Sequence, residues 1–156
     1  MPKINEKLAE LLQKREFVSI ATVGKDGQPN SVPKFLFRGK GNYLYLVDYV
    51  FGKTVTNIRE NPKVSVSFMD FDNLEAYRFN GNARLIESGR AFDAIFKLWD
   101  AKVLSLSTDR VIEAVRTGKK RHHYEVEMTE RFVILKIHVE NVIKIGRKGD
   151  VWQETG

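Results

Sequence analysis

The chain contains 156 residues, of which 42% are hydrophobic and 29% are charged, a composition typical of a folded, water-soluble domain and unlike that of a disordered chain. It has no cysteine, which excludes disulfides, zinc–thiolate sites and thiolate nucleophiles. The formal net charge of +6 favours an anionic partner without identifying it.

The first predicted element is an amphipathic helix over residues 4–15. Ile4, Leu8, Leu11 and Leu12 recur there at helical spacing, and lysine and glutamate fill most of the other positions. The segment lacks the apolar run and the small-residue cleavage site of a secretory signal. No later segment is apolar over the roughly 18 residues that a membrane span needs. We therefore expect a cytoplasmic protein without membrane contact.

The next predicted elements are strands separated by turns and one short helix. In chain order they are strands at 17–23, 30–38 and 43–49, a helix at 53–60, and strands at 63–70 and 75–88. Asp26-Gly27 between the first two strands is a strong hairpin signal, and Asn61-Pro62 ends the short helix. Gly81, inside the last of these strands, indicates a β-bulge.

Helical patterns and one long strand fill the rest of the chain. Residues 90–104 and 109–117 carry apolar residues at helical spacing, and we interpret them as a helical insert at about 90–118. A strand is predicted at 131–146, followed by a polar tail that holds Trp152. The basic run at 118–123 has no interleaved aromatic residue, which favours a solvated loop and no nucleic acid partner.

Together these elements predict a mainly β fold with flanking helices. The early connections are too short for parallel crossovers, so the six strands should pair antiparallel. A sheet of this size removes its exposed edges most easily by closing into a small barrel. Because no linker or internal repeat interrupts the sequence, we predict a single domain over residues 1–156.

The tripeptide Gly52-Lys53-Thr54 matches the end of a Walker A motif, but Val47 occupies the position of the first glycine of that motif. A nucleotide-binding P-loop is therefore not expected. Lys53 and the Thr54 hydroxyl at a helix start would instead suit one phosphate monoester, because unpaired N–H groups and the helix dipole favour an anion there. In the alternative interpretation, Thr54 only caps the helix and Lys53 is a surface charge.

Metal and hydrolase chemistry have little support in the sequence. His122 and His123 are adjacent, and His138 stands alone in a predicted strand, so no metal-ligand spacing is present. There is no Gly-x-Ser-x-Gly nucleophile elbow. We predict no metal site and assign no catalytic side chain.

Residues 17–68 resemble the pyridoxamine 5'-phosphate oxidase-like family of FMN-binding split barrels. The resemblance depends on the turn Asp26-Gly27-Gln28-Pro29, the pair Val32-Pro33, the pair Lys53-Thr54 at a helix start, and Asn61-Pro62-Lys63-Val64 after that helix. It covers about the first 90 residues well. The remainder matches only in the order of its elements.

The resemblance implies a six-stranded antiparallel split β-barrel that forms a homodimer with FMN sites at the subunit interface. It places the flavin phosphate on Lys53 and Thr54. It places the isoalloxazine ring along the backbone of Pro33, Lys34, Phe35, Val47, Asp48, Tyr49 and Val50. Lys34 is a candidate for a positive charge near flavin N1, and Trp152 of a second subunit is a candidate for covering the ring.

The resemblance favours an oxidoreductase that exchanges a hydride between FMN and a small substrate. The C-terminal segment NVIKIGRKGDVWQETG lacks the substrate-binding signature of true pyridoxamine phosphate oxidases, so oxidation of vitamin B6 is not expected. Three alternatives remain open. They are a non-catalytic flavin carrier, sensor or storage protein, a haem-binding protein that uses His122 and His123, and a deazaflavin-dependent reductase.

Overall fold

A computed structural model describes residues 3–49, 52–118 and 131–155 of the chain. The helices are α1 (Glu6–Gln13), α2 (Lys53–Glu60) and α3 (Arg90–Thr117). The strands are β1 (Phe17–Val23), β2 (Pro29–Lys40), β3 (Tyr43–Tyr49), β4 (Lys63–Asp70), β5 (Glu75–Ile86), β6 (Phe132–Ile145) and β7 (Val151–Thr155). Val50, His122 and His123, which the sequence singled out, lie outside the described residues.

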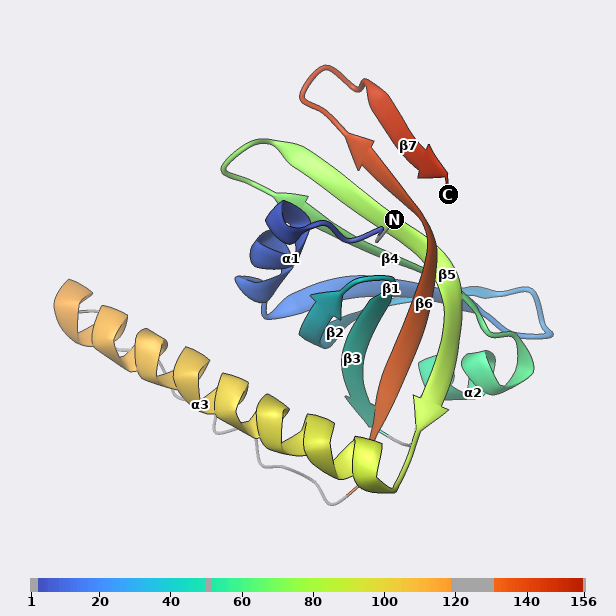
Figure 1. The fold of residues 1–156 in the computed structure, drawn as a ribbon, viewed down its shortest axis with the longest axis horizontal. Coiled ribbons are helices and arrows are strands. Elements are labelled where there is room, and N and C mark those ends of the chain that lie inside the picture. Colours follow the sequence, from blue (N-terminus) through green and yellow to red (C-terminus); the bar gives the residue numbers. More distant parts are fainter. Residues whose placement is uncertain (1–2, 50–51, 119–130, 156) are drawn as a thin grey trace.

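Six of the strands form a closed antiparallel barrel, as predicted (Figure 1). The hydrogen-bonded order is β3-β2-β1-β4-β5-β6, and pairing of β3 with β6 closes the circle. Closure leaves neither β3 nor β6 with an unpaired barrel edge, which is the physical advantage of a barrel over an open sheet. The fold is therefore mainly β, with three flanking helices in the described ranges.

The interpretation of the C-terminal segment as a polar tail is wrong, because this segment forms β7. β7 pairs with the end of β6 through a hairpin in which Lys144 is opposite Trp152. Gly149, with φ of 77°, adopts the left-handed conformation that the tight turn requires. β7 extends the sheet beyond the closed barrel rather than entering it.

The barrel encloses the main hydrophobic core. Alternate residues of each strand point inward, and α1 covers one end of the barrel with Leu8 and Leu12. Asn5 accepts a hydrogen bond from the Leu8 N–H and thereby caps α1. The largest fully buried side chains in the described residues are Phe79, Leu12, Ile20, Leu36, Leu44, Leu46, Ile134, Leu135, Ile137, Val55, Val66 and Val133.

Two bulges interrupt the ladders. The register between β5 and β6 shifts next to Gly81, so the predicted bulge is present, but its extra residue is Glu140 on β6. A Cβ added at Gly81 would lie 2.0 Å from the backbone oxygen of His138, so only glycine allows this close approach. The second bulge is in β2, where Phe37 is the extra residue opposite β3.

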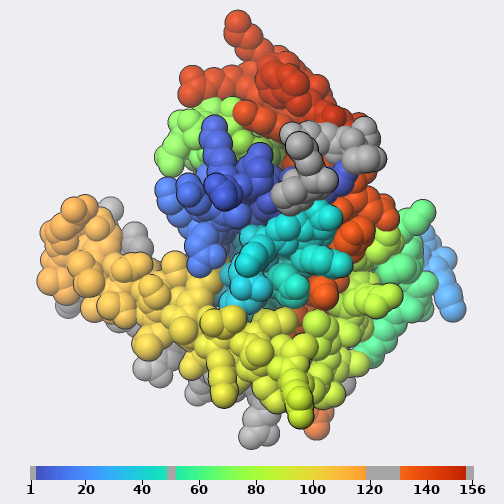
Figure 2. All heavy atoms as spheres, in the orientation of Figure 1, coloured from blue at the N-terminus to red at the C-terminus, as the bar shows by residue number. Residues whose placement is uncertain are grey.

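α3 is one continuous helix of 28 residues, and it joins the two helical stretches that the sequence suggested. Its first half packs Trp99 and Phe96 on the outer face of β2 and β3, in a second hydrophobic cluster with Phe37, Val47 and other residues. Its second half projects away from the barrel (Figures 1 and 2). Neither α3 nor any other helix in the described ranges is long and apolar enough to cross a membrane.

Candidate functional site

α2 begins at Lys53, the residue predicted from sequence, and its N-terminus has no side-chain cap. Gly52 occupies the N-cap position with an extended backbone, and a Cβ added there would meet nothing within 4 Å. The space at the Gly52 Cβ position, next to the first-turn N–H groups and the positive end of the helix dipole, is therefore open. This combination suits an anionic group.

Lys53 pairs with Asp26 across the gap between α2 and the β1–β2 turn. The Lys53 Nζ lies 2.8 Å from Asp26 Oδ2, and both side chains are about half exposed, at 48% and 52%. The hydrogen bond from Lys53 lowers the pKa of Asp26, and the same bond raises the pKa of Lys53. An exposed pair of this kind contributes little to stability, so Lys53 is free to change partners at small cost. The sequence marked Asp26 only as a turn residue.

Thr54 lies beneath the helix start rather than at its surface. Its side chain is buried, and Asn30 Nδ2 donates a hydrogen bond to Thr54 Oγ1 at 3.2 Å. Asn57 Nδ2 donates to Thr22 Oγ1 at 3.1 Å, so the network ties α2 to the β1–β2 hairpin. Gly52, not Thr54, is the N-cap residue, which excludes the interpretation of Thr54 as a cap. Direct contact between Thr54 and a phosphate stays a prediction.

The predicted flavin-binding segments of β2 and β3 lie side by side, with Phe35 opposite Val47. The side chains of both residues pack against α3, and the rings of Phe35 and Trp99 are 5.8 Å apart. Pro33 is exposed near the middle of β2, and Tyr49 is the last residue of β3. Because α3 covers the outer face of β2 at Phe35, a flat ligand on these strands would contact the strand backbone near Pro33 and Tyr49 instead.

Lys34 and Asp48 form a cross-strand ion pair with 2.5 Å between Lys34 Nζ and Asp48 Oδ1. They lie one position beyond the opposed residues Phe35 and Val47, and the alternation along each strand puts them on the same face as the core residues Leu36 and Leu46. The Asp48 side chain is only 2% exposed, and that of Lys34 is 19% exposed. The assignment of Lys34 as a positive charge near flavin N1 stays a prediction, and the adjacent carboxylate offsets much of that charge.

Trp152 lies in β7, at the end of the barrel that α1 covers, whereas Lys53 lies at the end where α2 begins (Figure 1). It is 51% exposed, and Lys144 Nζ lies 5.5 Å from the centre of its ring. Within one chain, the fold therefore does not bring Trp152 to the predicted phosphate residues. Whether Trp152 covers a flavin in a second subunit stays a prediction.

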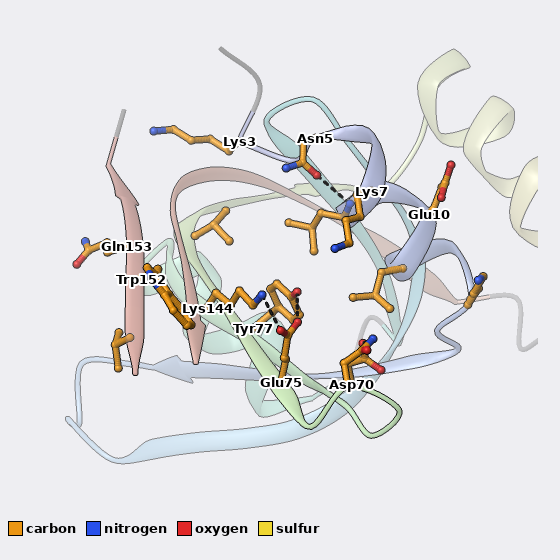
Figure 3. A pocket seen from close by; sticks show the side chains of 16 residues that line it. Lys3, Asn5, Lys7, Glu10, Asp70, Glu75, Tyr77, Lys144, Trp152 and Gln153 are labelled. Atoms are coloured by element: carbon orange, nitrogen blue, oxygen red, sulfur yellow. Dashed lines mark hydrogen bonds and ion pairs between the residues drawn. The ribbon is translucent and has the colours of Figure 1, made fainter. Parts of the chain in front are cut away.

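A groove of about 960 Å³ runs between α1 and the β6–β7 hairpin (Figure 3). Trp152 forms one wall of the groove. The polar side chains of Glu75, Lys144 and Tyr77 form the floor of the groove. Lys144 Nζ lies 2.7 Å from Glu75, and the Tyr77 hydroxyl donates to Glu75 at 2.9 Å. Lysine side chains from α1 and the preceding residues line the opposite rim.

The floor of this groove has fixed protonation states near neutral pH. The hydrogen bond from Lys144, followed by that from Tyr77, lowers the pKa of Glu75. Burial and the bond to Glu75 raise the pKa of Tyr77 to about 12. Glu75 is therefore ionised and Tyr77 protonated, and neither is poised to transfer a proton at pH 7. The described residues contain no cluster of three side chains able to hold a metal ion.

Residues 4–145 match the family model of pyridoxamine 5'-phosphate oxidase. The chain therefore belongs to the pyridoxamine 5'-phosphate oxidase family. It is also 35% identical over 91 residues to an uncharacterized protein of Methanocaldococcus jannaschii, in an alignment that covers 56% of this chain and 59% of that protein. The match thus spans less than two thirds of that relative.

Solved structures with the same fold include an FMN-binding protein, a heme-binding protein and HupZ. HupZ of Group A Streptococcus is 22% identical with a TM-score of 0.66, and the alignment covers 92% of this chain and 95% of that one. A pyridoxamine 5'-phosphate oxidase-related, FMN-binding protein of Nostoc punctiforme is 16% identical with a TM-score of 0.55, over 90% and 86% of the chains. A heme-binding protein of Mycobacterium smegmatis is 16% identical with a TM-score of 0.62, and the alignment covers 94% of this chain and 57% of that one. At these identities, the similarity shows the fold alone.

Proposed function

We propose that the protein binds FMN and is an oxidoreductase that exchanges a hydride between the flavin and a small substrate. The observation that carries this proposal is the uncapped N-terminus of α2, with Lys53 at its first position, in a chain of the pyridoxamine 5'-phosphate oxidase family. The open space at Gly52 leaves room for a phosphate beside the first-turn N–H groups.

The residues present suit a phosphate monoester better than a larger polyphosphate. The monoester carries a charge of about −1.5 to −2 at neutral pH, which one ammonium group and one helix N-terminus can balance. Lys53 would exchange its exposed partner Asp26 for the phosphate. Once bound, FMN supplies the electron and hydride chemistry, and the protein contributes binding, orientation and exclusion of water.

We further propose a homodimer in which each site receives residues from both subunits. Lys53 begins α2 and Trp152 lies in β7, at the other end of the barrel, which favours a flavin site built from two subunits. The half-exposed Trp152 is an aromatic surface of the kind that interfaces bury. Size-exclusion chromatography with light scattering should give twice the mass of the 18.0 kDa chain. A monomer would contradict this arrangement.

The experiment that tests cofactor binding is the absorption spectrum of the purified protein, with mass identification of any small molecule released on denaturation. We expect a flavin spectrum that dithionite bleaches, and the mass of FMN. A protein that stays colourless after addition of FMN would contradict the proposal. The mass also separates FMN from a deazaflavin, and turnover with a panel of electron acceptors separates an enzyme from a flavin carrier.

Haem binding is the second candidate, because a heme-binding protein of Mycobacterium smegmatis shares the fold. Among the described residues the one histidine is His138, which is exposed on the outer wall of the barrel. A Soret band in the spectrum of the purified protein would favour haem. Its absence after incubation with haemin, together with a bound flavin, would exclude this candidate.

A further inference from the structure

The outer wall of the barrel carries a strip of basic and aromatic side chains that follows the strand register. Arg38 of β2 is opposite Tyr45 of β3, Tyr45 is opposite Lys136 of β6, and Lys136 is opposite Arg84 of β5. Two residues along the same strands, and therefore on the same face, Tyr43 is opposite His138. Figure 1 shows β3, β6 and β5 side by side. Because paired residues share a face, this basic strip projects from a single side of the sheet.

The cations of the basic strip have no carboxylate partner in the described part of the chain. None of the ion pairs there includes Arg38, Arg84 or Lys136. Arg84 and Lys136 are directly opposite each other, and like charges in that position destabilise a sheet. The nearby acid Glu140 accepts a hydrogen bond from Asn82 instead. Among residues 3–49, 52–118 and 131–155, the strip therefore has no carboxylate paired with its cations.

The tyrosines hold these cations in place. Lys136 Nζ lies 4.4 Å from the centre of the Tyr43 ring and 6.0 Å from that of Tyr45. The guanidinium carbon of Arg38 lies 5.7 Å from the Tyr45 ring. Such cation–π contacts orient the charges without neutralising them. Because the protein's own cations already occupy the ring faces, the tyrosines are poor platforms for stacked nucleic acid bases.

A groove of about 620 Å³ lies along the basic strip. Its polar lining is Arg84, Lys136, His138 and Asn82, and Ile86 and Tyr43 supply its apolar lining on the outer face. A guanidinium group presents paired N–H donors that match two oxygens of a phosphate, and an ammonium group adds a point charge. The volume is in the range of small-molecule sites. Charged donors beside an apolar wall match a small organic molecule that carries a phosphate.

We propose that this groove binds a small organic phosphate, with the phosphate group on Arg84 and Lys136 and the organic part against Ile86. The site differs from the proposed flavin phosphate site, which depends on Lys53 at the start of α2. It does not require that the protein bind FMN. Arg84 provides the paired hydrogen bonds, Lys136 the second charge, and His138 a further donor.

The test is an NMR titration of the protein as purified, and again after saturation with FMN, using phenyl phosphate as the probe. We expect saturable shifts of backbone amides at 82–86 and 136–138 under both conditions. Benzyl alcohol, which lacks the phosphate, should produce no such shifts. The double variant Arg84→Gln, Lys136→Gln should weaken phenyl phosphate binding by about tenfold or more.

The matched control is Arg59→Gln, which removes one positive charge that is paired with Glu87 and lies outside the strip. It should leave binding unchanged. Equal weakening by the control would show nonspecific attraction, and loss of the shifts after FMN saturation would assign the groove to the cofactor. Tighter binding of a thymidine decamer at the same amides would assign the strip to nucleic acid. Loss of self-association in the double variant would assign it to contact with a second copy of the chain. Each of these results would overturn the proposal.

Discussion

The ammonium nitrogen of Lys102 in α3 lies 2.7 Å from the backbone carbonyl oxygen of Leu36 in β2. It also lies 3.1 Å from the carbonyl oxygens of Phe37 and Arg15. Phe37 is the extra residue of the β2 bulge, where the ladder hydrogen bonds are interrupted. A buried lysine thus supplies three donors to backbone groups that need them, and it joins the helical insert to the barrel.

Replacement of Lys102 by methionine should destabilise the protein by about 2 kcal/mol or more, because buried carbonyl groups lose their donor while the side-chain volume is nearly kept. Urea denaturation followed by circular dichroism measures the change. Lys97→Met, at an exposed position of the same helix, is the control and should change stability by less than about 0.5 kcal/mol. Equal midpoints for the two variants would show that the three contacts contribute nothing.

The stability of the folded chain should also depend on pH through Lys102. Burial lowers the pKa of Lys102 to about 8, from 10.5 for a free lysine. Below pH 8 the Lys102 amine is protonated in the folded and in the unfolded chain. Between pH 8 and pH 10.5 only the unfolded chain keeps the proton. Raising the pH through this window therefore favours the folded state. The stability difference between the wild type and Lys102→Met should grow from pH 8 to pH 10, and a constant difference would contradict this assignment.

The fold could be predicted from local patterns where those patterns are strong. Alternation of apolar residues identified the six barrel strands, and the turn at Asp26-Gly27 and the stop at Asn61-Pro62 set the limits between them. β7 was missed because its sequence VWQET has no apolar alternation, and its pairing depends on Gly149 in a turn that nothing in the local hydrophobic pattern marks.

The candidate site was less accessible to sequence reasoning, because it depends on contacts between distant segments. The start of α2 at Lys53 follows from its local sequence, but the partner Asp26 is 27 positions away. Lys102 was missed because a lysine on an amphipathic helix is normally solvated. The opposition of Arg84 and Lys136 requires the register between β5 and β6, which no motif encodes.

Gly81→Ala should disrupt the barrel, because the new Cβ would lie 2.0 Å from the His138 carbonyl oxygen in the backbone of β6. Backbone cannot move aside as a flexible side chain can, so we expect a loss of about 3 kcal/mol or more. Thermal unfolding measures it. Gly52→Ala is the control, since its Cβ enters open space on extended backbone, and it should cost no more than about 1 kcal/mol.

Asp26→Asn should tighten the binding of FMN, because the wild-type carboxylate both neutralises Lys53 and repels an incoming phosphate. We expect an increase in affinity of a few-fold at low salt that shrinks as the salt concentration rises. Isothermal titration calorimetry measures both. Asp72→Asn, an exposed carboxylate beyond the end of β4, is the control for net charge. Unchanged affinity in Asp26→Asn would place the flavin phosphate elsewhere.

The composite site can be tested by mixing two defective variants. Lys53→Ala should weaken FMN binding by about tenfold, because it removes a charge-assisted contact to the phosphate. Trp152→Ala should weaken it through loss of the aromatic cover, by about 0.5 to 1.5 kcal/mol. If each site combines Lys53 of one subunit with Trp152 of the other, a mixed dimer has one site with both substitutions and one site with neither.

The mixed dimer, prepared by co-expression with two different affinity tags, should therefore bind one FMN with wild-type affinity and a second one far more weakly. If Lys53 and Trp152 served the same flavin within one chain, both sites of the mixed dimer would be defective and no wild-type site would appear. Titration with FMN followed by quenching of flavin fluorescence distinguishes the two results. Because the fold places Lys53 and Trp152 at opposite ends of the barrel, we expect recovery of one intact site.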